Sequence, residues 1–232
     1  MCFSAEVSYA AAAVLLPLGT ISIYKAYKTD RRYMAICTLP LLFGLQQLFE
    51  GLVWTGGEAG DMAAVGRFSL AYMFFSWLAW PVWVPISAFF LEPERRKPLY
   101  LGFAVLGAIL GSGLYVPYFV HQGWLTVTFQ PHAISYGGIE TFDFLVSRYF
   151  TYLVYVSAVV LPLLIASKRE VKIFGILVAL VLATTMAFFR YAYISVFCFG
   201  GALMSLYLVG MIFWVAKREA LTQGSRTTAA HA

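Results

Sequence analysis

Apolar residues run along this chain in long stretches that short polar segments separate. A helix needs about 20 largely apolar residues to cross a bilayer core of about 30 Å. The last stretch, residues 173–216, has a single charge and would form about 66 Å of helix, so we expect two helices there. The pattern predicts seven membrane-spanning helices, at residues 7–24, 33–55, 68–91, 98–120, 144–167, 173–190 and 191–216.

The chain is predicted to form a single domain, with one long connection and a polar tail. Residues 1–219 form the predicted seven-helix domain, and residues 220–232 are polar and small enough to predict a disordered tail. The longest connection, residues 121–142, is expected to cap one mouth of the bundle. Within it, Trp124–Phe129 alternates apolar and polar residues as a short strand does, and the alternatives are a plain cap or a two-stranded ribbon.

Composition supports an all-α, polytopic membrane protein. The chain is 61% hydrophobic and only 12% charged, against about 25% charged in soluble proteins, and its mean hydropathy is +0.79. The net charge of +5 does not indicate nucleic-acid binding, because the basic residues form short clusters between apolar runs. We expect the lipid bilayer, not nucleic acid, to be the partner of this surface.

Charge placement predicts the orientation. Thirteen of the 16 Lys and Arg residues fall in connections on one side of the predicted bundle or in the tail. The positive-inside rule therefore predicts an N-terminus outside and a C-terminus in the cytoplasm, in a bacterial inner membrane.

Three ionisable residues lie within the predicted helices, and the orientation places all of them near the outer surface: Glu50, Arg148 and Arg190. A charge in the bilayer costs several kcal/mol unless it is paired, so such residues indicate functional sites. Gln46, Glu50 and Trp54 are spaced i, i+4, i+8 and share a helix face, with Gln47 beside them. Glu50 could thus hold a ligand, proton or metal, or it could simply pair with Arg148 or Arg190 and fix packing.

The two arginines suggest a ligand as well. Guanidinium groups that converge in an outer cavity would bind a carboxylate or phosphate in a bidentate manner. Tyr193 follows Arg190 closely and could add a phenol, although aromatic residues are ordinary at membrane interfaces.

The chain opens Met-Cys, which suggests a second chemistry. Removal of Met1 would leave Cys2 with a free amine beside its thiol, able to act as a nucleophile or to chelate a metal. With Glu50 as general base, these two residues form a candidate catalytic pair. The alternative is a short N-terminal cap with an unreactive thiol.

A divalent metal such as zinc could bind Cys2, Glu50, His121 and His132, although no HxxxH or HExxH spacing supports this set. The alternative for His121 and His132 is a solvated or helix-capping role. Retinal is not expected, because the last helix contains no lysine for a Schiff base between Tyr191 and Ala216.

The opening Met-Cys-Phe-Ser-Ala, the Gln-Gln-x-x-Glu-Gly-x-x-Trp of residues 46–54 and the seven-helix layout resemble an uncharacterised bacterial membrane-protein family. The resemblance covers most of the chain and implies no activity. It directs attention to Cys2, Gln47, Glu50 and Trp54.

Three classes of function follow from these residues. The first is the binding or processing of a small polar, anionic ligand in an outward-facing pocket, with Cys2 and Glu50 as a membrane enzyme's catalytic groups. The second is a sensor or an accessory subunit, whose partner is another membrane protein or a second copy of the chain. The third is a small-solute or proton-coupled transporter in which Glu50 carries the proton.

Overall fold

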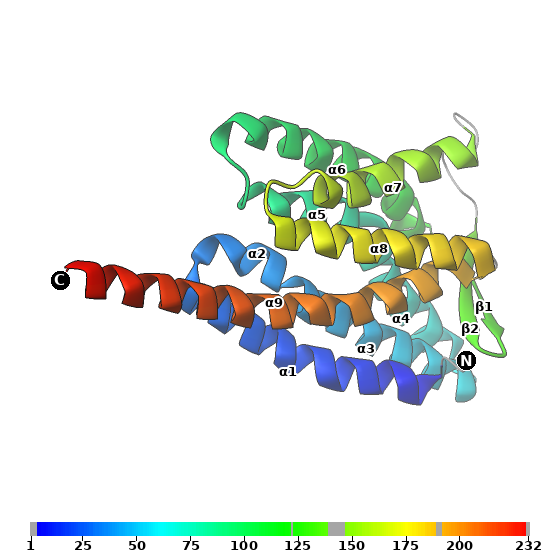
Figure 1. Ribbon diagram of the computed structural model, residues 1–232. Helices are drawn as coiled ribbons and strands as arrows, with labels where there is room; N and C mark the ends of the chain where they lie inside the picture. The colour runs from blue at the N-terminus through cyan, green and yellow to red at the C-terminus, as the bar shows by residue number, and fades with distance from the viewer. Residues whose placement is uncertain (1–3, 122, 139–146, 189–191, 231–232) are drawn as a thin grey trace.

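The fold is a bundle of long helices with one β-hairpin at one end (Figure 1). It is seen in a computed structural model, which describes residues 4–121, 123–138, 147–188 and 192–230. The elements are α1 (Ala5–Thr29), η1 (Arg31–Tyr33), α2 (Met34–Cys37), α3 (Leu39–Glu58), α4 (Met62–Met73), η2 (Phe74–Ala79), α5 (Trp80–Phe89), η3 (Glu94–Arg96), α6 (Lys97–Val120), β1 (Leu125–Gln130), β2 (Ala133–Gly138), α7 (Arg148–Leu164), α8 (Arg169–Phe188) and α9 (Tyr193–Ala230).

Six helical segments of the described chain are long and apolar enough to cross a membrane. A further helix, Tyr149–Leu164, is apolar but shorter. Large apolar side chains cover the outside of the bundle; Ile109 and Phe119 on α6, for example, are 68% and 64% exposed. Such a surface suits contact with lipid tails, so the chain is an all-α, multi-pass membrane protein.

Most predicted helix boundaries differ by a few residues from those of the structure. The second predicted helix starts earlier and consists of η1, α2 and α3 in succession. The last helix, α9, continues through Ala230, whereas a disordered tail is predicted from residue 220. The tail sequence contains no proline and a single glycine, Gly224, so it lacks the residue that terminates helices most strongly.

The third predicted helix is interrupted by a π-helical turn, η2, between α4 and α5. In this turn the Trp80 N–H donates to the Phe75 carbonyl, five residues back. The next such bond would need an N–H at Pro81, which proline lacks, so the Ser76 carbonyl is released from the helix. The hydroxyl of Tyr155 on α7 donates to this carbonyl instead.

Helix α6 packs directly on this irregular segment. A Cβ on Gly107 would lie 1.9 Å from the Pro81 carbonyl oxygen, so only glycine permits the approach. Close contact of this kind is how helices associate where the hydrophobic effect is weak. It holds α6 beside α5 and so forms one wall of the cavity described below.

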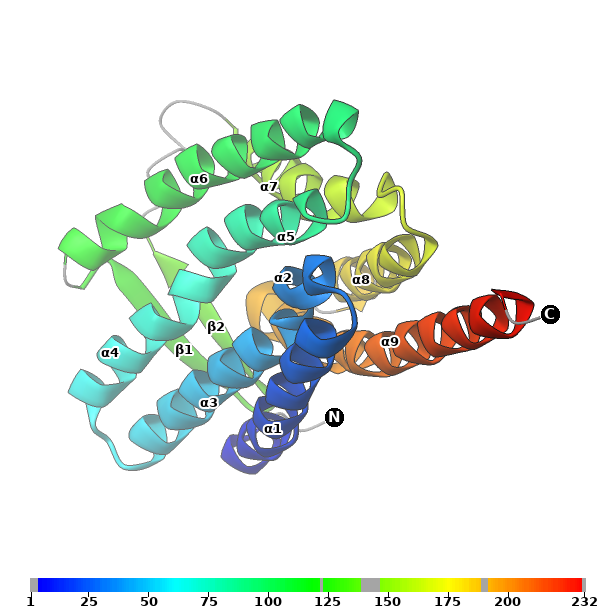
Figure 2. The ribbon, with the colours of Figure 1, turned by 90° about the vertical axis from the view of Figure 1, so that its left-hand side faces the viewer.

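Of the two alternatives for the connection after α6, the structure contains the two-stranded ribbon. Strands β1 and β2 pair antiparallel, with Gln130 opposite Ala133 at the turn. Ile134 and Tyr136 are buried against the bundle, beside residues of α3, α4 and α9. The hairpin therefore lies across the ends of these helices, as Figure 2 shows.

The basic connections gather at the opposite end of the bundle, where α9 also ends (Figure 1). There the Glu92 carboxylate accepts hydrogen bonds from the Ser167 backbone N–H at 2.5 Å and from the Ser167 hydroxyl at 2.6 Å. Arg96 lies 3.5 Å from the same carboxylate. These contacts join the α5–α6 and α7–α8 connections. We call this the basic end and the other the hairpin end.

Candidate functional site

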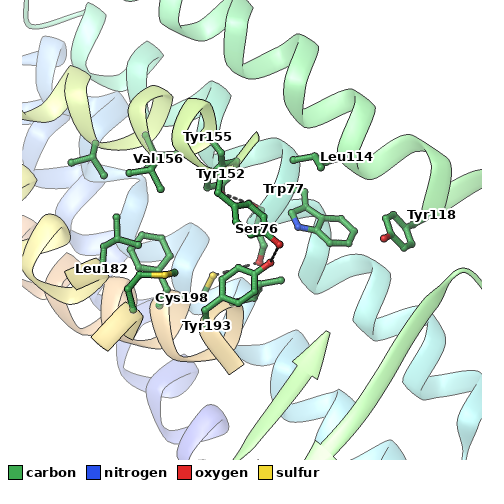
Figure 3. A pocket seen from close by; sticks show the side chains of 15 residues that line it. Ser76, Trp77, Leu114, Tyr118, Tyr152, Tyr155, Val156, Leu182, Tyr193 and Cys198 are labelled. Carbon is green, nitrogen blue, oxygen red and sulfur yellow. Dashed lines mark hydrogen bonds between the residues drawn. The ribbon is translucent and has the colours of Figure 1, made fainter. Parts of the chain in front are cut away.

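A cavity of about 80 Å³ lies between η2, α6, α7, α8 and α9 (Figure 3). Helices α7 and α8 are joined at the basic end and diverge toward the hairpin end (Figure 1). The wall is mostly apolar, but it also carries five aromatic side chains with polar atoms: Trp77, Tyr118, Tyr152, Tyr155 and Tyr193.

Two of these phenols meet across the cavity. The Tyr152 hydroxyl on α7 and the Tyr193 hydroxyl on α9 are 2.8 Å apart, as Figure 3 shows. Tyr155 is one turn further along α7 and is hydrogen-bonded to the carbonyl of Ser76. The cavity therefore offers hydroxyl groups at one part of an otherwise apolar wall. An arrangement of this kind fixes the orientation of a bound molecule.

A chain of hydrogen bonds leads from the cavity wall into the bundle. The Ser76 hydroxyl and the Cys198 thiol both line the cavity and lie 3.4 Å apart. Gln46 donates from Nε2 to the Ser76 hydroxyl at 2.9 Å, and Trp80 donates from Nε1 to Gln46 Oε1 at 3.1 Å. Gln46 is fully buried, so both ends of its amide are satisfied by protein groups.

Glu50 lies one turn further along α3, and it is only 2% exposed. Gln47 donates from Nε2 to Glu50 Oε2 at 3.1 Å, and the hydroxyl of Ser195 donates to Oε1 at 2.5 Å. Glu50 is not among the described residues that line the cavity. Instead it binds the first turn of α9, next to Tyr193, and so fixes the helix that carries that phenol.

The side chains around Glu50 toward the hairpin end are aromatic. Trp54 packs on Phe129 of β1, with ring centroids 5.6 Å apart, and Tyr72 stacks on Tyr136 of β2 at 4.9 Å. Burial, followed by the negative charge of Glu50, raises the pKa of Tyr136 well above its usual value. Tyr136 is therefore a neutral phenol close to the Glu50 carboxylate.

Several buried polar atoms in this region have no hydrogen-bond partner in the described protein: Gln47 Oε1, Trp54 Nε1 and the Tyr136 hydroxyl. Buried polar groups in proteins almost always have a protein or water partner.

The predicted metal ligands do not form one site within the described residues. His121 is exposed and stacks on Trp124, with centroids 4.3 Å apart, and His132 is exposed at the hairpin turn. No group of three His, Cys, Asp or Glu side chains suited to a metal occurs in the described ranges. Cys2 lies outside those ranges, so the zinc hypothesis stays a prediction.

The side chains of the two predicted arginines are not among the described parts of the structure. Arg190 lies outside the described residues, and Arg148 begins α7 but its side chain is outside them. The hypothesis that either one pairs with Glu50 or binds an anion therefore stays a prediction. The ion pairs among the described residues all lie near the basic end: Arg32–Asp30, Arg96–Glu92 and Lys97–Glu94.

Sequence reasoning missed most of the cavity-lining polar residues. Ser76 had a usable signal, because Pro81 follows five residues later and a proline in a helix releases a carbonyl upstream. Cys198 lies in an apolar run, where a cysteine resembles any small apolar residue, and Ser195 has no pattern that marks it. Among the predicted residues, Tyr193 lines the cavity and Gln46 reaches its wall through Ser76.

The fold and this site define a polytopic helical membrane protein with an aromatic cavity near the hairpin end. The chain belongs to a family of unknown function, DUF6629, whose model matches residues 1–226. This confirms the predicted membership of an uncharacterised family. Neither a curated protein nor a solved structure matches the chain.

Proposed function

We propose that this protein binds a small polar molecule with an apolar part in the cavity between η2 and α6–α9. The observation that carries the proposal is the composition of the cavity wall. Apolar side chains make up most of it, the hydroxyls of Tyr152 and Tyr193 lie together on it, and Ser76 also lines it. A ligand would place its polar group against these hydroxyls and its apolar part against Val156 and Leu182.

The surrounding network supports this function because it fixes the positions of the polar groups in advance. Ser76 is held by Gln46, and α9 is held at Ser195 by Glu50. Preorganised groups of this kind lose little entropy when a ligand binds. In this proposal Glu50 is a positioning residue for Tyr193 and for the rest of the first turn of α9.

The proposal keeps the predicted location and orientation: a bacterial inner membrane, with the hairpin end outside. Basic residues lie at the other end of the bundle, which the positive-inside rule assigns to the cytoplasm. The ligand would then enter from the outer side or from the outer leaflet. An anionic group on it would require the predicted contributions of Arg148 and Arg190.

The test uses a cavity-filling substitution. Val156 on α7 lines the cavity, whereas Val154 is on the same helix, is also half-buried and does not line it. We expect a solvent extract of the purified wild-type protein to contain a small molecule, detected by mass spectrometry. Val156→Phe should lose it and Val154→Phe should retain it.

Two results would contradict the proposal. One is an equal content of the molecule in both variants; the other is a wild-type protein that carries no small molecule from the membranes in which it was made. Unfolding temperatures of both variants show whether they are folded. The mass of the extracted molecule also indicates whether it carries an anionic group.

A further inference from the structure

An open groove of about 880 Å³ lies between α8 and α9 at the basic end of the bundle, away from the aromatic cavity. On α9, Gly210, Trp214 and Arg218 follow each other at intervals of four residues and therefore share one helix face. On α8, Arg169 and Ile173 have the same spacing. Each helix thus presents an arginine toward the basic end and apolar residues deeper in the bundle.

The two arginines form a cationic rim to the groove. Both are exposed, and the guanidinium carbon of Arg218 lies 4.5 Å from the centroid of the Trp214 ring. Tryptophan is enriched where headgroups meet acyl chains, and arginine near the end of a membrane helix reaches the same region. Guanidinium groups bind phosphate oxygens in a bidentate manner, so this rim suits a phosphodiester.

The deeper part of the groove is apolar and has room along its length. Ile173 and Trp214 are 38% and 51% exposed. A Cβ placed on Gly210 would meet no atom within 4 Å, so this position is open. The groove is therefore cationic at its rim and apolar further in, the polarity of an amphipathic chain with a charged end.

The acidic residue of the groove wall is engaged elsewhere. Glu170 accepts a hydrogen bond from the Tyr33 hydroxyl at 2.6 Å, which directs its carboxylate toward η1. Its backbone carbonyl accepts a hydrogen bond from Tyr207 at 3.1 Å. The charge that faces a molecule in the groove is consequently set by Arg169 and Arg218.

We propose that this groove binds one anionic phospholipid, with its phosphate between Arg169 and Arg218 and an acyl chain along Gly210 and Ile173. The source of the phosphate is a lipid, because the apolar part of the groove continues directly from the cationic rim. Basic pockets between membrane helices on the cytoplasmic side are known to bind such headgroups. The inference does not depend on the function proposed for the aromatic cavity.

The headgroup is tested by native mass spectrometry of the full chain with phosphatidylglycerol and phosphatidylcholine of identical acyl chains. We expect the wild type to retain phosphatidylglycerol preferentially. Loss of two charge-assisted contacts in the double variant Arg169→Gln/Arg218→Gln should weaken phosphatidylglycerol binding about tenfold or more and abolish the preference. The control Arg95→Gln removes an exposed arginine elsewhere at the basic end and should leave the preference for phosphatidylglycerol unchanged.

The acyl chain is tested by filling the groove. Gly210→Leu should reduce the retention of both lipids while both arginines remain. Gly102→Leu on α6 is the matched control, because its Cβ is also free of neighbours within 4 Å, and it should retain both lipids.

Three results would overturn the proposal. Unchanged phosphatidylglycerol retention in the double arginine variant would remove the headgroup site. Equal effects of Gly210→Leu and Gly102→Leu would remove the acyl-chain site. Displacement of the lipid by inorganic phosphate alone would indicate a site for a free anion instead.

Discussion

The hydroxyl of Ser195 donates a hydrogen bond to Oε1 of Glu50, which joins α9 to α3 across 145 residues of sequence. Both side chains are buried, with exposures of 1% and 2%. Glu50 is one helical turn from Gln46, and Ser195 is two residues from Tyr193. The bond therefore connects the interior hydrogen-bond network with the cavity wall. This contact makes Glu50 the centre of the packing at the hairpin end.

Replacement of Glu50 by alanine should destabilise the fold. The substitution leaves Ser195 Oγ and Gln47 Nε2 without their acceptor, at a cost of about 1–3 kcal/mol for each buried donor. Glu58→Ala, an exposed glutamate at the end of the same helix, should cost little. Thermal unfolding in detergent measures both, and equal unfolding temperatures for the two variants would contradict the role of Glu50.

Glu92→Ala should loosen the basic end without affecting the hairpin end. The buried Glu92 carboxylate accepts both the backbone N–H and the hydroxyl of Ser167, and its loss leaves a backbone donor unpaired. We expect a loss of about 1–3 kcal/mol in unfolding free energy. Hydrogen exchange should increase in the connection that contains Ser167. Unchanged exchange there would show that the contact does not hold the two connections together.

The sequence predicted the membrane helices and the β-ribbon well because both depend on local patterns. Uncharged apolar runs define α1 and α6, and the alternation of apolar and polar residues defines β1. The sequence analysis did not predict the π-helical turn η2. This turn depends on Pro81 and also on the close packing of Gly107 of α6 against it, and the second condition involves a distant part of the chain.

The candidate site was predicted only in part, for a related reason. Gln47 lies three residues before Glu50 on one helix, and the sequence leaves open whether Gln46 or Gln47 is the neighbour of Glu50; in the structure Gln47 donates the hydrogen bond. The partner Ser195 is on a distant helix, and no pattern in the sequence shows which residue of α9 faces α3. The cavity depends on how far α7 and α8 diverge, which no spacing within a helix determines.

Tyr136 should make the stability of the protein sensitive to alkaline pH. Its pKa is raised by burial and by nearby negative charge in the folded state. The unfolded chain therefore loses this proton first, at about pH 10, and folding stability is lost as the pH rises above that value. Tyr136→Phe should reduce the fall in unfolding temperature between about pH 8 and about pH 11. Tyr149→Phe, at a position that is 78% exposed, should leave the fall as it is in the wild type.

The Cys2 hypothesis predicts a processed N-terminus and a metal that depends on it. We expect the intact mass to lack Met1 and elemental analysis to find a divalent metal that Cys2→Ser removes. Cys37→Ser is the control, because Cys37 is buried and free; it should retain the metal. A retained Met1, or equal metal content in the two variants, would contradict the aminothiol hypothesis.

The orientation predicts which end of the bundle faces the outside of the cell. In a Cys2→Ser background the remaining thiols, Cys37 and Cys198, are buried, so one added cysteine reports its own position. His132→Cys at the exposed hairpin turn should react with a membrane-impermeant maleimide on intact cells. Arg95→Cys at the basic end should react only after the membrane is opened, because the positive-inside rule places that end in the cytoplasm. The reverse pattern would invert the topology and move the mouth of the aromatic cavity to the cytoplasmic side.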